Sequence, residues 1–248
     1  MPTSLITGWH DVWVDQTFEQ YARLRRAGCE TALLVGPWTH TSVLQQGWPE
    51  VFTETLAWLR THLHADRSGL RPTGVRVHLG GADDWRDLDA WPADPSTTAW
   101  FPTRDGHLTR QPPTDPLPLT SFRYDPADPT PSLGGPLLSR TAGARDNGRL
   151  EDVNVCDGLG RLRTTGGELT RITVPMSATA HRFAVGHRLR WQISGGAHPR
   201  YARGSGTGDP PLDAAHLVPA HLTLHADSAL LLPRGATAAL PQGPEEND

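Results

Sequence analysis

The 248-residue sequence contains no lysine, so all 23 of its basic side chains are arginines. Its 27 acidic side chains outnumber them and give a formal net charge of -4. A protein that binds nucleic acid usually concentrates positive charge in a run or on one face, and the sequence has no such basic run. The charge pattern therefore argues against nucleic acid as a partner.

Cysteine is almost as scarce, because Cys29 and Cys156 are the only two. A secreted domain stabilised by disulfides uses more cysteines, so we expect two unpaired thiols in a reducing compartment. No run approaches the ~18 apolar residues of a membrane-spanning helix. The first residues, Met1–Ser4, lack the basic and apolar regions of a signal peptide. Together these absences predict a cytoplasmic protein that does not contact a membrane.

Motifs for a catalytic serine and for phosphate binding are also absent. No serine occurs in a G-x-S-x-G pattern, which places a nucleophilic hydroxyl on a sharp strand-to-helix turn. Ser205 lies in the glycine-rich segment Gly204–Gly208, but this segment lacks that turn and has no lysine to bind a phosphate. We interpret it as a loop, and we expect no nucleophile in this sequence.

Two groups of side chains resemble metal ligands only superficially. They are Asp83, Asp84, Asp87 and Asp89, and His216, His221 and His225. The aspartates lack the glycine and glutamate spacing of a calcium-binding loop, so we expect them to cap turns around Trp85 and Trp91. No cysteine or carboxylate completes an obvious zinc shell with these histidines, which favours exposed strand histidines. We predict neither a metal nor a cofactor.

The first 66 residues predict an α/β unit. Apolar runs at Leu5–Thr7 and Ala32–Val35 are typical of buried strands. Apolar residues at helical spacing predict one helix that begins near Asp15 and ends at Gly28. A second helix is predicted from about Glu50 to His64. Strand, helix, strand, helix is the order of a parallel sheet.

The character of the sequence changes after residue 66. Proline and glycine become frequent, and short alternating segments replace the helical spacing, which indicates a β-sandwich over 67–234. The expected strands include Val75–Leu79, Thr98–Phe101, Val153–Cys156, Leu169–Val174, Arg188–Ile193 and Ala220–His225. Residues 235–248 are rich in alanine, proline, glycine and glutamate and predict a disordered tail. The predicted fold class is α/β plus all-β.

An aspartate and a histidine follow the two predicted strands of the α/β unit. Asp11 lies in GWHD after the first strand, and His40 lies in GPWTH after the second. Taken alone, they fit a turn-capping aspartate and a loop histidine as well as an acid–base pair. Four tryptophans lie close to these turns, namely Trp9, Trp13, Trp38 and Trp48. Their positions suit core packing and pocket lining equally well.

A series of motifs follows these turns in a fixed order. They are GWHDVW (8–13), LLVGPWTH (33–40), LAWLRTHL (56–63), VRVHLGGADDWRDLDAWP (75–92), WFPTRDGHL (100–108), YDPADPTPSLGG (124–135), NVCDGLGRLR (154–163) and RLRWQISGGAHPRYARGSGTG (188–208). In this order they resemble the C-terminal half of the cocaine esterase / X-Pro dipeptidyl-peptidase (CocE/NonD) family of serine hydrolases. The resemblance runs from Gly8 to about Pro233 and implies a partial α/β-hydrolase sheet followed by a jelly-roll β-sandwich.

The resemblance also implies roles for the two polar residues. Asp11 matches the aspartate and His40 the histidine of a Ser–His–Asp triad, whose order along the chain is Ser, Asp, His in this fold. His40 then moves the serine proton, while Asp11 orients the imidazole and stabilises its charged form. The family acts on aromatic esters, α-amino acid esters, β-lactam side-chain amides or X-Pro peptides, and the sequence does not choose among them.

The sequence departs from the family in two places. The N-terminal half is missing, with most of the sheet, the serine, the oxyanion-hole donor and the helical cap. Several sandwich strands are also missing near Glu151, and each departure is expected to leave a sheet edge unpaired. Three hypotheses follow: a hydrolase completed by a complementary N-terminal half and acting on a small ester or peptide, a catalytically inactive remnant, and a non-catalytic β-sandwich binding module.

Overall fold

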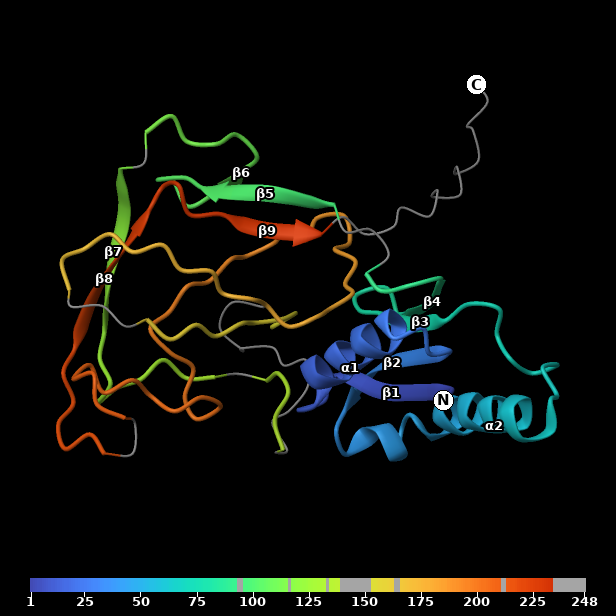
Figure 1. Cartoon of the computed structure of the whole chain (residues 1–248). Helices are drawn as coiled ribbons and strands as arrows, with labels where there is room; N and C mark the ends of the chain where they lie inside the picture. The colour runs from blue at the N-terminus through green and yellow to red at the C-terminus, as the bar shows by residue number, and fades with distance from the viewer. Residues whose placement is uncertain are drawn as a thin grey trace, which may run out of the picture. The chain divides into compact units, whose positions relative to one another are not determined.

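The computed structural model describes residues 1–92, 96–115, 117–132, 134–138, 153–162, 166–210 and 213–233. The chain divides into two units, and Figure 1 shows its course from the N-terminus to the C-terminus. One combines Met1–Asp89 with Phe122–Leu222, and the other combines Ala90–Ser121 with Thr223–Asp248. The predicted tail at 235–248 and the predicted missing strands at 151–152 lie outside the described residues.

The first unit contains a four-stranded sheet and two long helices. Its elements are β1 (Thr3–His10), α1 (Val14–Arg26), β2 (Thr31–Thr39), the 3₁₀ helix η1 (Ser42–Leu44), α2 (Trp48–His64), β3 (Val75–Leu79) and β4 (Asp84–Leu88). The strand order is β1-β2-β3-β4; β2 is parallel to both β1 and β3, and β4 is antiparallel to β3. The predicted order strand, helix, strand, helix is therefore present in 1–66.

The sheet continues beyond residue 66, where the sequence suggested a boundary. Strand β3 was assigned to the sandwich by its alternation, but Val75 pairs with Leu33 of β2 in the parallel sheet. Strand β4 was not predicted, because Asp84 and Asp87 were expected in turns. Both lie within the strand, and the bidentate ion pair of Asp87 with Arg76 across the ladder explains why a charged segment is extended here.

Trp38 forms the centre of a small core between β2 and α2. It is buried and packs with Leu34 and Val51, and Trp85 of β4 joins this cluster. A Cβ at either Gly36 or Gly47 would lie 2.5 Å from atoms of the Trp38 ring, so both positions require glycine. Trp85 was expected on the sandwich, and it packs instead on the α/β core.

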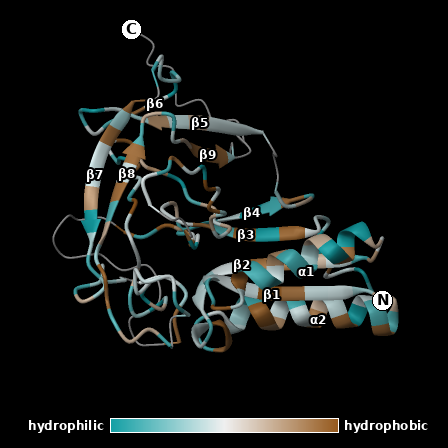
Figure 2. Cartoon of the chain, turned by 60° about the vertical axis from the view of Figure 1, so that its left-hand side comes forward, coloured by the Kyte–Doolittle hydropathy of each residue, from teal (hydrophilic) through white to brown (hydrophobic). Residues whose placement is uncertain are grey.

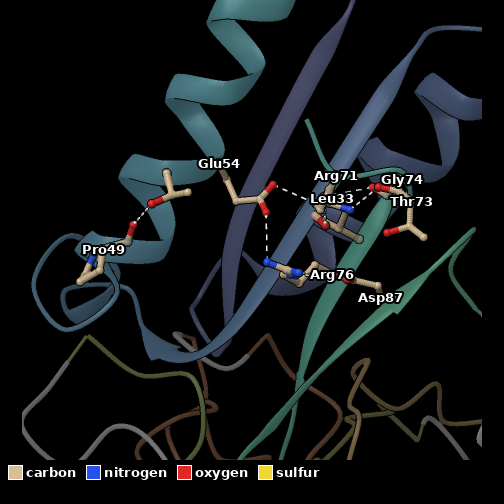
Figure 3. Close-up of polar contacts among 9 residues, drawn as sticks. Leu33, Pro49, Glu54, Arg71, Thr73, Gly74, Arg76 and Asp87 are labelled. Atoms are coloured by element: carbon tan, nitrogen blue, oxygen red, sulfur yellow. Dashed lines mark hydrogen bonds and ion pairs between the residues drawn. The ribbon is translucent and has the colours of Figure 1, made fainter. Parts of the chain in front are cut away.

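A buried ion pair joins α2 to the sheet (Figure 3). Arg71 Nε donates to Glu54 Oε2 over 2.8 Å, and the two side chains are only 8% and 15% exposed. Arg71 Nη2 also donates to the carbonyl of Leu33 on β2 over 3.1 Å. Arg76 of β3 lies 3.6 Å from the other Glu54 oxygen. These contacts hold the Glu54 side of α2 toward β2 and β3.

The remaining strands form two small sheets in the described residues. Strands β5 (Thr97–Pro102), β6 (Leu108–Thr109) and β9 (Leu230–Pro233) are ordered β6-β5-β9, and β7 (Pro118–Tyr124) pairs with β8 (Ala220–His225). Two predicted strands, Thr98–Phe101 and Ala220–His225, are present. The other three predictions, at 153–156, 169–174 and 188–193, are wrong, because these described segments form no strand. The jelly-roll topology stays a prediction.

Across the described ranges, we find no helix that combines the length and the apolar character needed to cross a bilayer.

Candidate active site

The register of β1 and β2 places Asp11 beside His40. The two strands pair in step from Thr3↔Thr31 to Gly8↔Gly36, and after an irregularity they pair again at His10↔Thr39. Asp11 directly follows β1 and His40 directly follows β2, so the parallel pairing of the two strands makes these residues neighbours. A Cβ on Gly8 would lie 2.1 Å from the Trp38 carbonyl oxygen, so this close approach of the strands requires glycine.

The two side chains meet in a hydrogen bond. His40 Nδ1 lies 3.0 Å from Asp11 Oδ1. The Asp11 side chain is buried at 8% exposure, whereas that of His40 is 43% exposed. Because a carboxylate only accepts, Nδ1 carries the proton in this contact and Nε2 keeps its lone pair. The arrangement can accept a proton at Nε2 and stabilise the resulting positive charge.

Asp11 is also held by the turn that begins α1. Its backbone N–H donates to the Gly8 carbonyl over 3.0 Å, and its Oδ1 accepts the Trp13 backbone N–H over 3.0 Å. The turn-capping interpretation of Asp11 and the acid–base interpretation are therefore compatible. The backbone contact fixes the carboxylate where His40 needs it.

Thr39 and Ser42 hold the turn that carries His40. The Thr39 backbone N–H donates to Ser42 Oγ over 2.9 Å, and the Ser42 N–H donates to Thr39 Oγ1 over 3.3 Å. This reciprocal pair closes the turn between β2 and η1, with His40 inside it. Sequence reasoning missed both residues, although a serine three positions after a threonine is a common local turn pattern.

The structure separates the four tryptophans near these turns into two pairs. Trp9 and Trp38 are buried, whereas Trp13 and Trp48 are about half exposed. Trp9 Nε1 donates to the His78 carbonyl over 2.7 Å, which joins the end of β1 to β3. Trp38 therefore packs in the core, whereas Trp9 both packs between strands and lines the cleft described below.

The contacts of Ser205 hold a loop together. It is buried, its Oγ lies 2.8 Å from Thr207 Oγ1, and its carbonyl accepts the Val218 backbone N–H over 2.7 Å. These contacts close a loop, as the sequence interpretation expected. In the part of the chain that the structure describes, no three His, Cys, Asp or Glu side chains gather closely enough to hold a metal ion.

A cleft of about 650 Å³ lies between β3 and the segments around Val155 and His181. Its lining includes His10, His78 and His181, which the sequence did not bring together. Burial lowers the pKa of His10, and burial followed by repulsion from His187 lowers the pKa of His181. The imidazoles of His10 and His181 are therefore neutral at pH 7. Neither Asp11 nor His40 lines this cleft.

Both cysteines are free thiols, and Cys156 is chemically protected. Burial, with smaller contributions from Asp157 and Asp15, raises its pKa to about 11. At pH 8 about one thiol in a thousand is then ionised, against about one in ten for a cysteine at the ordinary pKa of 9.0. We expect a Cys29→Ser variant to react with iodoacetamide about 100-fold more slowly when folded than when unfolded in urea. Equal rates in the two states, measured by mass spectrometry, would contradict this burial.

Comparisons with known proteins agree with this architecture. A family model described as the X-Pro dipeptidyl-peptidase C-terminal non-catalytic domain matches residues 140–231. The cocaine esterase of Rhodococcus sp. (strain MB1 Bresler) is 24% identical over 291 residues, an alignment that covers 84% of this chain and 50% of that protein. The chain thus spans about half the length of the curated relative it matches.

A solved α-amino acid ester hydrolase shares the fold. It superimposes with a TM-score of 0.51 at 20% identity over 60% of this chain and 30% of that one. An aminopeptidase from a marine sediment Thaumarchaeota archaeon gives a TM-score of 0.45 at 19% identity over 57% of this chain and 26% of that one. The chain is therefore similar to the cocaine esterase / X-Pro dipeptidyl-peptidase hydrolases, as the sequence motifs predicted, and these matches are consistent with the C-terminal half of such proteins.

Proposed function

We propose that this chain supplies the general base and its aspartate partner to a serine hydrolase that cleaves esters or amides. The observation that carries the proposal is the 3.0 Å contact between His40 Nδ1 and Asp11 Oδ1. It leaves Nε2 as the proton acceptor on a side chain that is 43% exposed. A buried carboxylate and an accessible imidazole nitrogen are the arrangement that the triad mechanism requires.

The reaction assigns one task to each residue. As a serine hydroxyl attacks the substrate carbonyl, His40 Nε2 accepts its proton, and Asp11 stabilises the imidazolium. His40 then gives the proton to the leaving alcohol or amine. Water, deprotonated in turn by His40, releases the acid and restores the serine. We propose that the serine comes from an N-terminal hydrolase half, because the triad order in this fold places it before the aspartate.

The relatives suggest the substrate class and the part played by the rest of the chain. Two of them are named for ester cleavage and the matched family model for a peptidase, which supports small esters or peptides as substrates. The same family model is described as non-catalytic. We therefore propose that the region matched by this model takes no part in the bond-breaking steps.

An esterase assay tests this proposal. The purified chain alone should hydrolyse a chromogenic acyl ester no faster than a Ser205→Ala variant does, and a fluorophosphonate probe should label neither. With an N-terminal hydrolase half added, turnover should appear and should fall by a factor on the order of 10⁶ in a His40→Ala variant. Serine labelling of the isolated chain would refute the need for a second half. A stable complex without turnover would favour an inactive remnant.

A further inference from the structure

Helix α2 has three distinct sides. At about 100° per residue, Trp48, Phe52, Leu59 and Leu63 fall within about 60° of one another. We call these four residues the apolar stripe. Val51 and Glu54 define a second side, which faces the sheet through the Trp38 core and the Arg71 ion pair. The polar residues Thr53 and Arg60 occupy the third side.

The apolar stripe is exposed. Its four side chains, Trp48, Phe52, Leu59 and Leu63, are 52%, 50%, 46% and 70% accessible. The centroids of the Trp48 and Phe52 rings lie 5.5 Å apart, so these two rings already form one apolar surface at the start of the helix. Figure 2 shows hydrophobic bands recurring along α2. Exposure of the apolar stripe to water costs free energy, and a partner that covers the stripe would remove that cost.

The geometry of the ion pair gives the direction in which the stripe points. Glu54 contacts Arg71 and Arg76, on the β2 and β3 side of the helix. The stripe lies about 120–180° around the helix from Glu54. Val51, between them, belongs to the Trp38 core, against which Ile6 of β1 also packs. The stripe therefore lies on the β1 side of α2.

The outer edge of β1 lies on that same side. Among the described strands, β1 pairs only with β2 and ends the sheet. Its eight residues, Thr3–His10, include no Asp, Glu, Arg or Pro. Native edge strands are usually short, charged, interrupted by proline or covered. An uncharged eight-residue edge beside an apolar helix surface has the character of an internal strand.

We propose that the edge of β1 and the apolar stripe of α2 form one docking surface for the N-terminal half of a related hydrolase. That half would add a strand parallel to β1 and cover the stripe with apolar side chains. The matched cocaine esterase contains as much chain again as this sequence covers, which is enough to supply both. This inference rests on the proposed function, because the docked half is the one that carries the serine.

Binding tests the surface independently of catalysis. The probe is the hydrolase half encoded directly upstream of this chain, expressed as a separate polypeptide. We expect a 1:1 complex by size-exclusion chromatography with light scattering. A Phe52→Asp/Leu59→Asp variant should weaken it on the order of 100-fold. The control, Thr53→Asp/Arg60→Asp on the polar side, should bind as the parent does, and circular dichroism should show all three chains equally helical.

Hydrogen exchange in the parent complex gives a second readout that needs no variant. The amides of Thr3–His10 and the first turns of α2 should exchange at least about tenfold more slowly when the half is bound. An upstream sequence without a hydrolase half, or no complex with it, would overturn the proposal. A homodimer of the parent that the Phe52→Asp/Leu59→Asp change abolishes would assign the surface to a second copy instead. A complex that forms without esterase activity would support this inference and count against the proposed function.

Discussion

Replacing Arg71 with methionine is expected to lower the free energy of unfolding by about 3–5 kcal/mol. The Arg71 side chain is only 8% exposed, and its loss leaves the Glu54 carboxylate buried with Arg76, 3.6 Å away, as its nearest cation. It also removes donors from the carbonyls of Leu33 and Gly74. Urea unfolding of the purified chain, followed by circular dichroism, measures the change.

Two further variants separate the buried pair from ordinary surface charge. Arg23→Met removes an ion pair with Glu19 whose side chains are 68% and 59% exposed, and it should cost less than about 1 kcal/mol. An Arg71→Met/Glu54→Leu double variant should recover part of the loss, because removing both charges leaves none unpaired. If Arg71→Met alone costs no more than Arg23→Met, the Glu54–Arg71 pair does not anchor α2.

The α/β part of the fold could be predicted because its signals are local. The apolar run Ala32–Val35 and the helical spacing from Glu50 to His64 each appear within one element, and the observed β2 and α2 contain them. Strand β4 had no such signal. Its sequence, DWRDL, is mostly charged, and its extended form depends on the Arg76–Asp87 pair with β3. Because the partner of this ion pair lies in a neighbouring strand, the pattern of residues within β4 does not predict it.

The three wrong strand predictions have the converse cause. Leu169–Val174 and Arg188–Ile193 alternate apolar and polar residues, but a strand forms only where a neighbour supplies hydrogen bonds. Neither segment belongs to one of the sheets in the described residues. The alternation of apolar and polar residues therefore did not predict whether either segment would pair with another strand.

The two residues of the candidate site could be predicted from the sequence, but the contacts that position them could not. Asp11 and His40 were identified by their place after two parallel strands and by family resemblance. An irregularity after Gly8 shifts the register to His10↔Thr39, and there Gly8 closely approaches the Trp38 carbonyl. Such an approach between strands is a tertiary contact, so the residues at the strand ends could be predicted from the sequence, whereas the 3.0 Å geometry between them could not.

An Asp11→Asn variant is expected to lose about 10⁴ in kcat once the chain is completed by a hydrolase half. Asparagine keeps the oxygen that accepts the Trp13 N–H, so the turn is retained. The Trp13 N–H and His40 Nδ1 both contact Oδ1, so the asparagine oxygen can accept from both, but it carries no charge to stabilise the His40 imidazolium. KM for a chromogenic ester should change little, because Asp11 is buried beneath His40 and away from solvent. Asp15→Asn, four residues along, is the matched control and should stay within about twofold of the parent, since Asp15 accepts a hydrogen bond from Ser177 and does not contact His40 through it.

A readout in the isolated chain distinguishes orientation from folding. The Nδ1 proton of His40 should give a downfield NMR resonance in the parent and in Asp15→Asn, and this resonance should move upfield in Asp11→Asn, because a neutral amide oxygen accepts more weakly than a carboxylate. An unchanged resonance position, or kcat within tenfold of the parent, would show that Asp11 only caps the turn.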